Sequence, residues 1–383
     1  MPNQATTAIH GAGHAERRPG SPVVSPITQS STFFWGGPAD GDLRYTRYAN
    51  NPNHLDLARK VAALEATEDA MVMASGMGAT SMTFLALARA GEHIVASTHL
   101  YGATVALLRD ELPRRGIDVT FVDPFLDGTA ALAAAIRPDT RVIHIELPTN
   151  PTLRILDPRP VAEFARKHGA ALTCDATFAS PAVLRPAALG VDLVIQSATK
   201  YLGGHSDLIA GTVAGSKEMI AAIRGTAKLY GPSLDPHATW LLDRGLRTLS
   251  VRMEQHGRNA LELARWFEMR KGVGAVVYPG LPDHPDHALA TELMNGYGGM
   301  LGIVLTGGAK AADRFLGRLR VAVAAPSLGG VETLVSQPRH TSHADLSRED
   351  RDGLGVPDGF VRISVGIEDV EDLKRDFARA LTG

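Results

Sequence analysis

The stretch that decides the fold reads GVDLVIQSATKYLGGHSD and runs from Gly190 to Asp207. Its apolar run, Leu193 to Ile195, has the length of a buried strand and is followed by small polar residues and then by Lys200. This layout presents an amine at the end of a strand, where it could form a Schiff base with a carbonyl cofactor. Ser197 and Thr199 are near enough in sequence to bind a phosphate of that cofactor. The alternative is an ordinary surface lysine, so residues elsewhere in the chain must decide between the two.

Similar apolar runs recur upstream of this stretch, with helical patterns between most of them. Such alternation predicts an α/β fold with a mainly parallel sheet that helices cover on both faces. In sheets of this kind ligands bind beyond the carboxyl ends of the strands, so the residues after each run are the candidates for a site. The runs are AMVMAS (70–75), HIVAS (93–97), DVTFV (118–122), RVIHIE (141–146), ALTCD (171–175) and LVIQS (193–197).

The first run is followed by a glycine-rich turn at the start of a helical pattern. Ser75, Gly76 and Met77 begin this turn, and the N–H groups of a helix N-terminus suit a phosphate. The turn is a poor dinucleotide fingerprint, because Ala79 follows the second glycine and no third glycine comes in register. A nicotinamide-dependent oxidoreductase is therefore disfavoured.

Three other strand ends carry polar or aromatic residues. Tyr101 follows HIVAS, where its ring could stack on a planar ligand or pack in the core. Asn150 follows RVIHIE in a loop that two prolines restrict. Asp175 ends ALTCD and precedes Thr177; it either caps the next turn or pairs with a strong donor such as a pyridinium N–H. With Lys200 and the glycine-rich turn, these are the groups that pyridoxal phosphate requires.

Composition restricts the class of partner. The chain has 383 residues and a formal charge of −2, so it offers no basic field for nucleic acid or an anionic membrane, and we expect a small-molecule partner. Cys174 is the only cysteine, which excludes an internal disulfide. No apolar stretch reaches the roughly 18 residues of a membrane helix, and we expect a cytoplasmic protein.

The chain is expected to divide into three parts. Residues 1–50 have little periodicity and are expected to form an extended arm, which needs another surface to lie on. Residues 51–245 would form the cofactor-binding domain, beginning with an amphipathic helix from His54 to Ala66, and residues 246–383 a small C-terminal domain. At the end of the arm, arginines and tyrosines at 44–48 could bind an anion or form a solvated loop.

From Ala8-Ile9-His10 onward the chain resembles the Cys/Met-metabolism family of pyridoxal-phosphate enzymes. Members include cystathionine γ-synthase, γ-lyase and β-lyase, methionine γ-lyase and O-acetylhomoserine sulfhydrylase. The family's most specific motif, a lysine in SATKY followed by Gly-His and Asp, is matched at Ser197 to Asp207. The resemblance implies pyridoxal 5′-phosphate as cofactor and an aspartate-aminotransferase-like (fold type I) large domain with a mainly parallel seven-stranded sheet. A smaller α+β domain would follow it.

The resemblance also implies roles for individual residues. Lys200 would carry the cofactor, Tyr101 would cover its ring and act as a catalytic acid, and Asp175 with Thr177 would hold the pyridine nitrogen. Tyr45 and Arg47 would reach the phosphate of a neighbouring subunit, which implies a homo-oligomer, commonly a tetramer built as a dimer of dimers. The phosphate would be held within one subunit by Ser75, Gly76, Met77, Ser197 and Thr199.

Substrate contacts follow from the same resemblance. Arg362 would bind the substrate carboxylate with help from Ser327 and Asn150, and Glu332 could meet the distal amine of cystathionine. Ala103 stands where methionine γ-lyases usually carry cysteine. We therefore expect γ-elimination or γ-replacement of the cystathionine γ-lyase or γ-synthase type. Methionine γ-lyase or O-acetylhomoserine sulfhydrylase activity is the alternative, and a catalytically inert cofactor-binding regulator is the alternative from another class.

Some features depart from the family pattern or lie outside it. Ala176 replaces the usual asparagine after the aspartate, and Asn50-Asn51-Pro52 carries one additional residue. Two histidine pairs, His284/His287 and His340/His343, have no carboxylate or cysteine to complete a metal site, so we expect solvated loops and no metal.

Overall fold

The computed structural model describes residues 3–11, 19–41, 43–126, 128–344 and 346–382. Its larger sheet has seven strands in the order β1-β7-β6-β5-β4-β2-β3. The pairs from β6 to β3 are parallel, and β7 is antiparallel to both β1 and β6. The strands are β1 (Asp69–Met73), β2 (His93–Ser97), β3 (Asp118–Val122), β4 (Thr140–Glu146), β5 (Ala171–Asp175), β6 (Leu193–Gln196) and β7 (Gly211–Gly215).

The predicted mainly parallel sheet is confirmed, with six of its strands at or within two residues of the predicted bounds. The seventh, β7, was not predicted as a separate strand, because its sequence GTVAG has no long apolar run and has glycine at both ends. It lies between β1 and β6 and pairs with both.

Helices cover both faces of this sheet, as the alternation of its side chains shows. Val72 and Val194 belong to the apolar cluster under α2, α6 and α9, whereas Met71 and Ile195 belong to the cluster under α3 and α8. Successive residues of a strand point to opposite faces, so both faces of the sheet are buried. The helices are α2 (Pro52–Glu65), α3 (Gly76–Leu87), α4 (Gly102–Ala106), α5 (Thr129–Ala134), α6 (Pro158–His168), α7 (Ser180–Val183), α8 (Lys217–Tyr230) and α9 (Pro236–Leu246).

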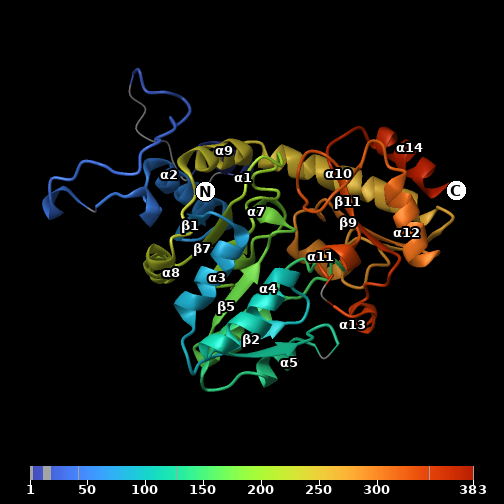
Figure 1. Ribbon diagram of the computed structural model, residues 1–383, viewed down its shortest axis with the longest axis horizontal. Coiled ribbons are helices and arrows are strands. Elements are labelled where there is room, and N and C mark those ends of the chain that lie inside the picture. The colour runs from blue at the N-terminus through green and yellow to red at the C-terminus, as the bar shows by residue number, and fades with distance from the viewer. Residues whose placement is uncertain (1–2, 12–18, 42, 127, 345, 383) are drawn as a thin grey trace.

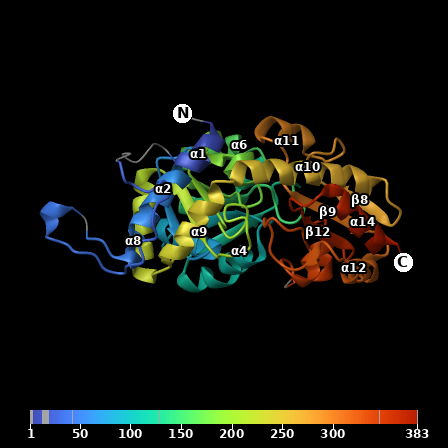
Figure 2. The ribbon, with the colours of Figure 1, turned by 90° about the horizontal axis from the view of Figure 1, so that it is seen from above.

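The C-terminal half forms a second sheet in the order β10-β11-β12-β9-β8, antiparallel except for the β10–β11 pair. Figures 1 and 2 both show α10 extending from the first half of the molecule to the second. The elements are α10 (Leu249–Glu268), β8 (Val273–Val277), α11 (His287–Leu293), β9 (Met300–Leu305), α12 (Gly308–Gly317), β10 (Val323–Ala324), β11 (Leu334–Ser336), α13 (Arg348–Gly353), β12 (Phe360–Ser364) and α14 (Val370–Leu381).

The two sheets have separate apolar cores, but the chain does not pass from one core to the other at a single residue. Leu249 and Met253 of α10, and Ala290 of α11, lie in the core of the large sheet. Leu263 and Phe267, later in α10, lie in the core of the small sheet. The expected boundary near residue 245 stays a prediction, because segments on its C-terminal side contribute to both cores.

The N-terminal segment is only partly extended. Residues 4–10 form a short helix, α1 (Gln4–His10), which Asn3 caps and which packs against α2 and α10. The extended part follows it and projects away from the body of the molecule (Figures 1 and 2). Phe34 and Trp35 on this part are exposed. Every helix in the described part of the chain is too short or too polar to span a lipid bilayer.

The additional asparagine before α2 has a structural role. Asn50 accepts a hydrogen bond from the Tyr45 N–H at 2.9 Å, and its amide donates to the Leu43 carbonyl. Asn51 is the N-cap of α2 and accepts from the Asn53 N–H. The two residues therefore shape the turn that leads from the arm into α2.

Candidate active site

Lys200 lies in the turn after β6, half-buried between the two halves of the molecule. Its Nζ donates a hydrogen bond to Ser327 Oγ at 2.6 Å. Burial, and then the neighbouring Arg362 guanidinium, lower the pKa of Lys200 to about 8. A lysine with a pKa in this range has a useful neutral fraction near pH 7, which nucleophilic attack on a carbonyl requires.

Ser327 connects this amine to the C-terminal sheet. Its backbone has φ +85°, a left-handed value that is unfavourable for serine. Its carbonyl accepts a hydrogen bond from Arg362 Nη2 at 3.1 Å. One residue thus contacts both Lys200 and Arg362 through different atoms.

Arg362 is on β12 and is buried, with 5% of its surface exposed. Its Nη1 donates to Asn150 Oδ1 at 3.1 Å, and its guanidinium lies 5.9 Å from the centre of the Phe178 ring. Burial lowers the pKa of Arg362 to about 10, so the group stays charged near neutral pH. A buried guanidinium held in this way is suited to bind a carboxylate.

Glu146 is a residue of the site that the sequence reasoning missed. It ends β4 and is buried, and it accepts hydrogen bonds from the Tyr101 N–H at 2.7 Å and the Asn150 N–H at 3.0 Å. Burial and the nearby Asp175 carboxylate raise the pKa of Glu146. Its carboxylate joins the loops that carry Tyr101 and Asn150. The signal that identified Asp175, a carboxylate at a strand end, was also present at Glu146.

Asp175 lies at the end of β5. Its Oδ1 accepts from the Thr177 N–H at 2.9 Å, and the Thr177 hydroxyl accepts from the Ser197 N–H at 2.8 Å. Burial raises the pKa of Asp175. Ala176 is fully buried and its N–H donates to the Ile195 carbonyl, so the support of Asp175 comes from Thr177.

The N-terminus of α3 faces the end of β6. Ser75 is the N-cap and accepts from the Gly78 N–H at 2.9 Å. A Cβ atom at Gly76 would lie 2.8 Å from the Cβ of Ser197, so only glycine permits this approach. The first N–H groups of a helix lack acceptors within the helix, so this close junction fits a phosphate group.

Two of the residues predicted to contact the phosphate, Thr199 and Met77, also make contacts within the protein. The Thr199 hydroxyl donates to the Ala210 carbonyl at 3.1 Å and accepts from the Ala210 N–H at 3.0 Å. The Met77 sulfur accepts from the Thr104 hydroxyl at 3.8 Å. Tyr101, the N-cap residue of α4, is 44% exposed, which leaves its ring available to a ligand.

Tyr45 and Arg47 lie at the base of the arm, beside the end of α8. Arg47 donates to the Lys228 carbonyl, and its guanidinium lies over the rings of Tyr45 and Tyr48 at 5.7 and 5.0 Å. Within the described part of the chain these contacts are with the arm and with α8. Their predicted role toward a neighbouring subunit stays a prediction.

Glu332 contacts the segment that follows Lys200. Its Oε1 accepts a hydrogen bond from the Ser206 hydroxyl, and it is only partly buried. A carboxylate is thereby brought to the 203–207 segment, although Glu332 and Ser206 are 126 residues apart in sequence.

Two of the four paired histidines differ from the expectation of solvated loops. His284 and His343 are buried, with 8% and 6% exposed, and burial lowers the pKa of each to about 4. They pack where the C-terminal half meets the large sheet, a position that sequence spacing did not indicate. The described residues contain no group of His, Cys, Asp and Glu side chains that could hold a metal ion.

The fold and the site together define a pyridoxal-phosphate-dependent enzyme, as comparison with known proteins establishes. The family model for Cys/Met metabolism PLP-dependent enzymes matches residues 5–382, and the chain belongs to that family. The cofactor and the class of enzyme predicted from sequence are confirmed.

Individual relatives agree with this assignment over nearly the whole chain. Cystathionine gamma-lyase of Bacillus subtilis is 41% identical over 98% of this chain and 98% of its own. L-methionine gamma-lyase of Porphyromonas gingivalis is 39% identical over 98% of this chain and 96% of its own. The crystal structure of cystathionine gamma-lyase from Lactobacillus plantarum complexed with L-serine has a TM-score of 0.92 at 35% identity, covering 99% of this chain and 98% of that one. The predicted fold type I architecture is confirmed.

Proposed function

We propose that this enzyme catalyses γ-elimination or γ-replacement on sulfur amino acids, and that its reaction is of the cystathionine γ-lyase or γ-synthase type. The observation that carries the proposal is the hydrogen-bonded series from Lys200 through Ser327 to Arg362. It joins the amine that would hold the cofactor to the guanidinium that would hold the substrate carboxylate.

The residues present fit pyridoxal phosphate. The turn of Ser75, Gly76 and Met77, with Ser197 and Thr199, would hold its phosphate, and the close junction at Gly76 supports this. Asp175, supported by Thr177, would face its ring nitrogen. Burial raises the pKa of Asp175, and a protonated ring nitrogen beside it would supply the positive donor that stabilises the ionised carboxylate. Tyr101 would cover the ring. When bound, the cofactor supplies an electron sink that makes protons next to the substrate amine removable.

The chain's own groups supply the proton transfers. Lys200, once freed by the substrate amine, would take the proton from Cα and move protons to and from Cβ, and its lowered pKa favours the neutral form that this role needs. Tyr101 would give a proton to the leaving γ-substituent. Arg362 and Asn150 would hold the α-carboxylate, with Ser327 fixing both ends of the series.

The choice within the family rests on two residues. Glu332 lies at the segment after Lys200, where its carboxylate would meet a distal ammonium such as that of cystathionine. Ala103 does not supply the cysteine expected of a methionine γ-lyase. Relatives of about 39–41% identity carry several reaction names, so identity does not choose among them. Methionine γ-lyase and O-acetylhomoserine sulfhydrylase activities remain the alternatives.

The proposal includes a homo-oligomer, a tetramer built as a dimer of dimers, in the cytoplasm. The exposed Phe34 and Trp35 on the projecting arm support a partner surface, and Tyr45 and Arg47 at its base would reach the neighbouring phosphate site. Mixing inactive Arg47→Ala and Lys200→Ala subunits tests this assignment. Mixed oligomers should regain part of the activity, and failure to regain any would contradict shared sites.

A product assay tests the reaction. Purified holoenzyme is given cystathionine, methionine or an activated homoserine ester, each with and without cysteine. Release of 2-oxobutanoate and ammonia from cystathionine indicates the lyase, and cystathionine formation from ester and cysteine indicates the synthase. No turnover of any substrate by protein with bound cofactor would refute the proposal in favour of an inert regulator.

A further inference from the structure

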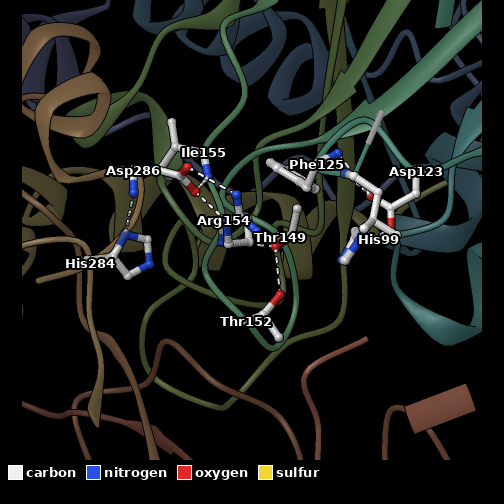
Figure 3. Close-up of polar contacts among 10 residues, drawn as sticks. His99, Asp123, Phe125, Thr149, Thr152, Arg154, Ile155, His284 and Asp286 are labelled. Atoms are coloured by element: carbon white, nitrogen blue, oxygen red, sulfur yellow. Dashed lines mark hydrogen bonds and ion pairs between the residues drawn. The ribbon is translucent and has the colours of Figure 1, made fainter. Parts of the chain in front are cut away.

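A second set of charged residues ties the loop after β4 to the C-terminal half (Figure 3). Arg154 donates through Nε and Nη2 to the Asp286 carboxylate at 2.6 and 3.2 Å. The Ile155 N–H donates to the same carboxylate at 2.8 Å. The side chains are 29% and 12% exposed, so water screens this pair less than a surface pair. Two side-chain bonds and one backbone bond fix the loop against the residue that precedes α11.

The face of the Arg154 guanidinium also has a partner. It lies 4.5 Å from the centre of the Phe125 ring, and that ring meets His99 edge to face at 4.9 Å. Asp123 accepts from the Phe125 N–H at 2.9 Å and contacts His99 Nε2 at 3.0 Å. Arginine suits this position better than lysine, because a planar guanidinium can stack on the ring and make two hydrogen bonds to one carboxylate at the same time, whereas a lysine ammonium makes only part of these contacts.

Hydrogen bonds within the loop connect Arg154 to Thr149, the residue before Asn150. The Arg154 N–H donates to Thr149 Oγ1 at 3.0 Å, and the Arg154 carbonyl accepts from the Thr149 N–H at 3.1 Å. The Leu153 N–H also donates to the Thr149 carbonyl at 2.9 Å. Thr149 and Arg154 are therefore paired across the loop, and the residue after Thr149 is Asn150.

Asn150 is the group of this loop that reaches Arg362, at 3.1 Å. Arg362 is set by β12, which pairs with β9, and β9 follows α11 in the chain. The contacts of the loop with the C-terminal half include Asn150 to Arg362 and Arg154 to Asp286. Without the second contact, the Asn150 side chain would depend on its bond to Arg362, while the Asn150 N–H stays bonded to Glu146.

From this arrangement we propose that Arg154 and Asp286 are positioning residues for substrate binding. They form a clamp, defined as Arg154, Asp286 and the stacked Phe125, that keeps Asn150 in place to orient the Arg362 guanidinium toward a substrate carboxylate. The clamp rests on the proposed function, because it assumes that Arg362 receives that carboxylate. It acts on substrate affinity and leaves the residues around the cofactor unchanged.

A neighbouring ion pair offers a matched control for a purely structural role. Arg159 Nη2 lies 2.7 Å from Glu292 Oε1, joining α6 to α11, so it also links the two halves of the chain. Its side chains are 47% and 56% exposed, and Arg159 lies beyond the loop. If the clamp only docked the two halves, loss of either arginine would have the same kind of effect.

The experiment compares Arg154→Met, Arg154→Lys, Asp286→Asn and Arg159→Met with the parent holoenzyme. Steady-state kinetics give kcat and KM for a γ-substituted amino acid. Spectral titration of the bound cofactor gives the affinity for that amino acid and for the amine that lacks its carboxylate. Crystal structures of the cofactor-free variants show whether Asn150 still contacts Arg362.

Loss of one oriented charge-assisted contact should raise KM about tenfold in Arg154→Met with kcat within about twofold of the parent. Affinity for the carboxylate-free amine should not change. Arg154→Lys and Asp286→Asn should show smaller shifts of the same kind, so either serves if Arg154→Met does not fold, and Arg159→Met should match the parent.

An Arg154→Met enzyme with the parent's KM, or one that loses affinity for amino acid and amine alike, would overturn the clamp. A parent that turns over no γ-substituted amino acid would refute the proposed function and the clamp with it. A parent that turns it over, with Arg154→Met unchanged, would refute the clamp alone.

Discussion

Lys200 Nζ donates to Ser327 Oγ at 2.6 Å, and the carbonyl of the same serine accepts from Arg362. Ser327 adopts φ +85° to make both contacts. A left-handed serine is unfavourable, so the surrounding structure must hold it there. The conformation places one residue between the two cationic groups of the site.

Substitution of Ser327 separates its two contributions. Ser327→Ala and Ser327→Gly both remove the hydroxyl that Lys200 contacts, so both should lower kcat/KM. Glycine tolerates φ +85° and alanine does not, so Ser327→Gly should be more stable than Ser327→Ala by about 1 kcal/mol. Thermal melting of the two variants measures this difference. Equal stability would show that the backbone at this position is unstrained.

The pKa of Lys200 predicts the reactivity of the cofactor-free protein. Acylation of Lys200, followed by peptide mass spectrometry, should rise with a midpoint near pH 8, because burial and Arg362 lower its pKa from the ordinary 10.5. Arg362→Gln should move the midpoint upward, since it removes a positive charge. Between pH 8 and 10.5 the unfolded chain holds this proton more tightly, so the contribution of Lys200 to stability rises with pH there. A midpoint that Arg362→Gln leaves in place would contradict the assigned cause.

Gly76 should be required for cofactor binding. The Cβ of a Gly76→Ala variant would lie 2.8 Å from the Ser197 Cβ, so α3 or the end of β6 must shift and the phosphate site must widen. We expect cofactor affinity to fall at least about tenfold. Gly225→Ala is the control, because a Cβ there meets no atom within 4 Å and alanine in a helix stabilises by about 0.5–1 kcal/mol. Equal cofactor affinity in the two variants would remove Gly76 from the site.

Glu65 predicts a pH dependence of stability outside the site. It is fully buried on α2 and accepts from Gln196 Nε2 at 2.9 Å, and burial raises its pKa from 4.5 to about 8. The folded state therefore keeps a proton that the unfolded chain releases, and this stabilisation is lost as pH rises from about 4.5 to 8. Glu65→Gln has no such dependence. The melting temperature of Glu65→Gln should therefore rise relative to that of the parent across this pH range, and the difference between the two should be constant at higher pH. A constant difference at all pH values would disprove the raised pKa.

Much of the large sheet could be predicted because its strands are short apolar runs that end in distinctive residues. Lys200, Asp175 and Asn150 were expected at the carboxyl ends of parallel strands, and the structure has them there. Strand β7 could not be found in this way, since its glycine-rich sequence is stabilised by pairing with both neighbours.

Contacts between distant segments were the part that sequence patterns could not supply. The strand-end position of Glu146 was visible in the sequence, but its link to Tyr101 was not, because the two residues are 45 positions apart. The Arg154–Asp286 pair joins residues 132 positions apart, and no local signal links them. The buried His284 and His343 were misjudged for the same reason, because their burial depends on how the two halves pack.

The central claim is that Lys200 holds the cofactor at this site, and borohydride reduction of the holoenzyme tests it most directly. Reduction should remove the visible absorbance and fix the cofactor to the protein, and peptide mass spectrometry should find the added mass on Lys200. Lys200→Ala should lose the fixed label and turnover together. Label on another lysine, or turnover by Lys200→Ala at the parent rate, would contradict the account.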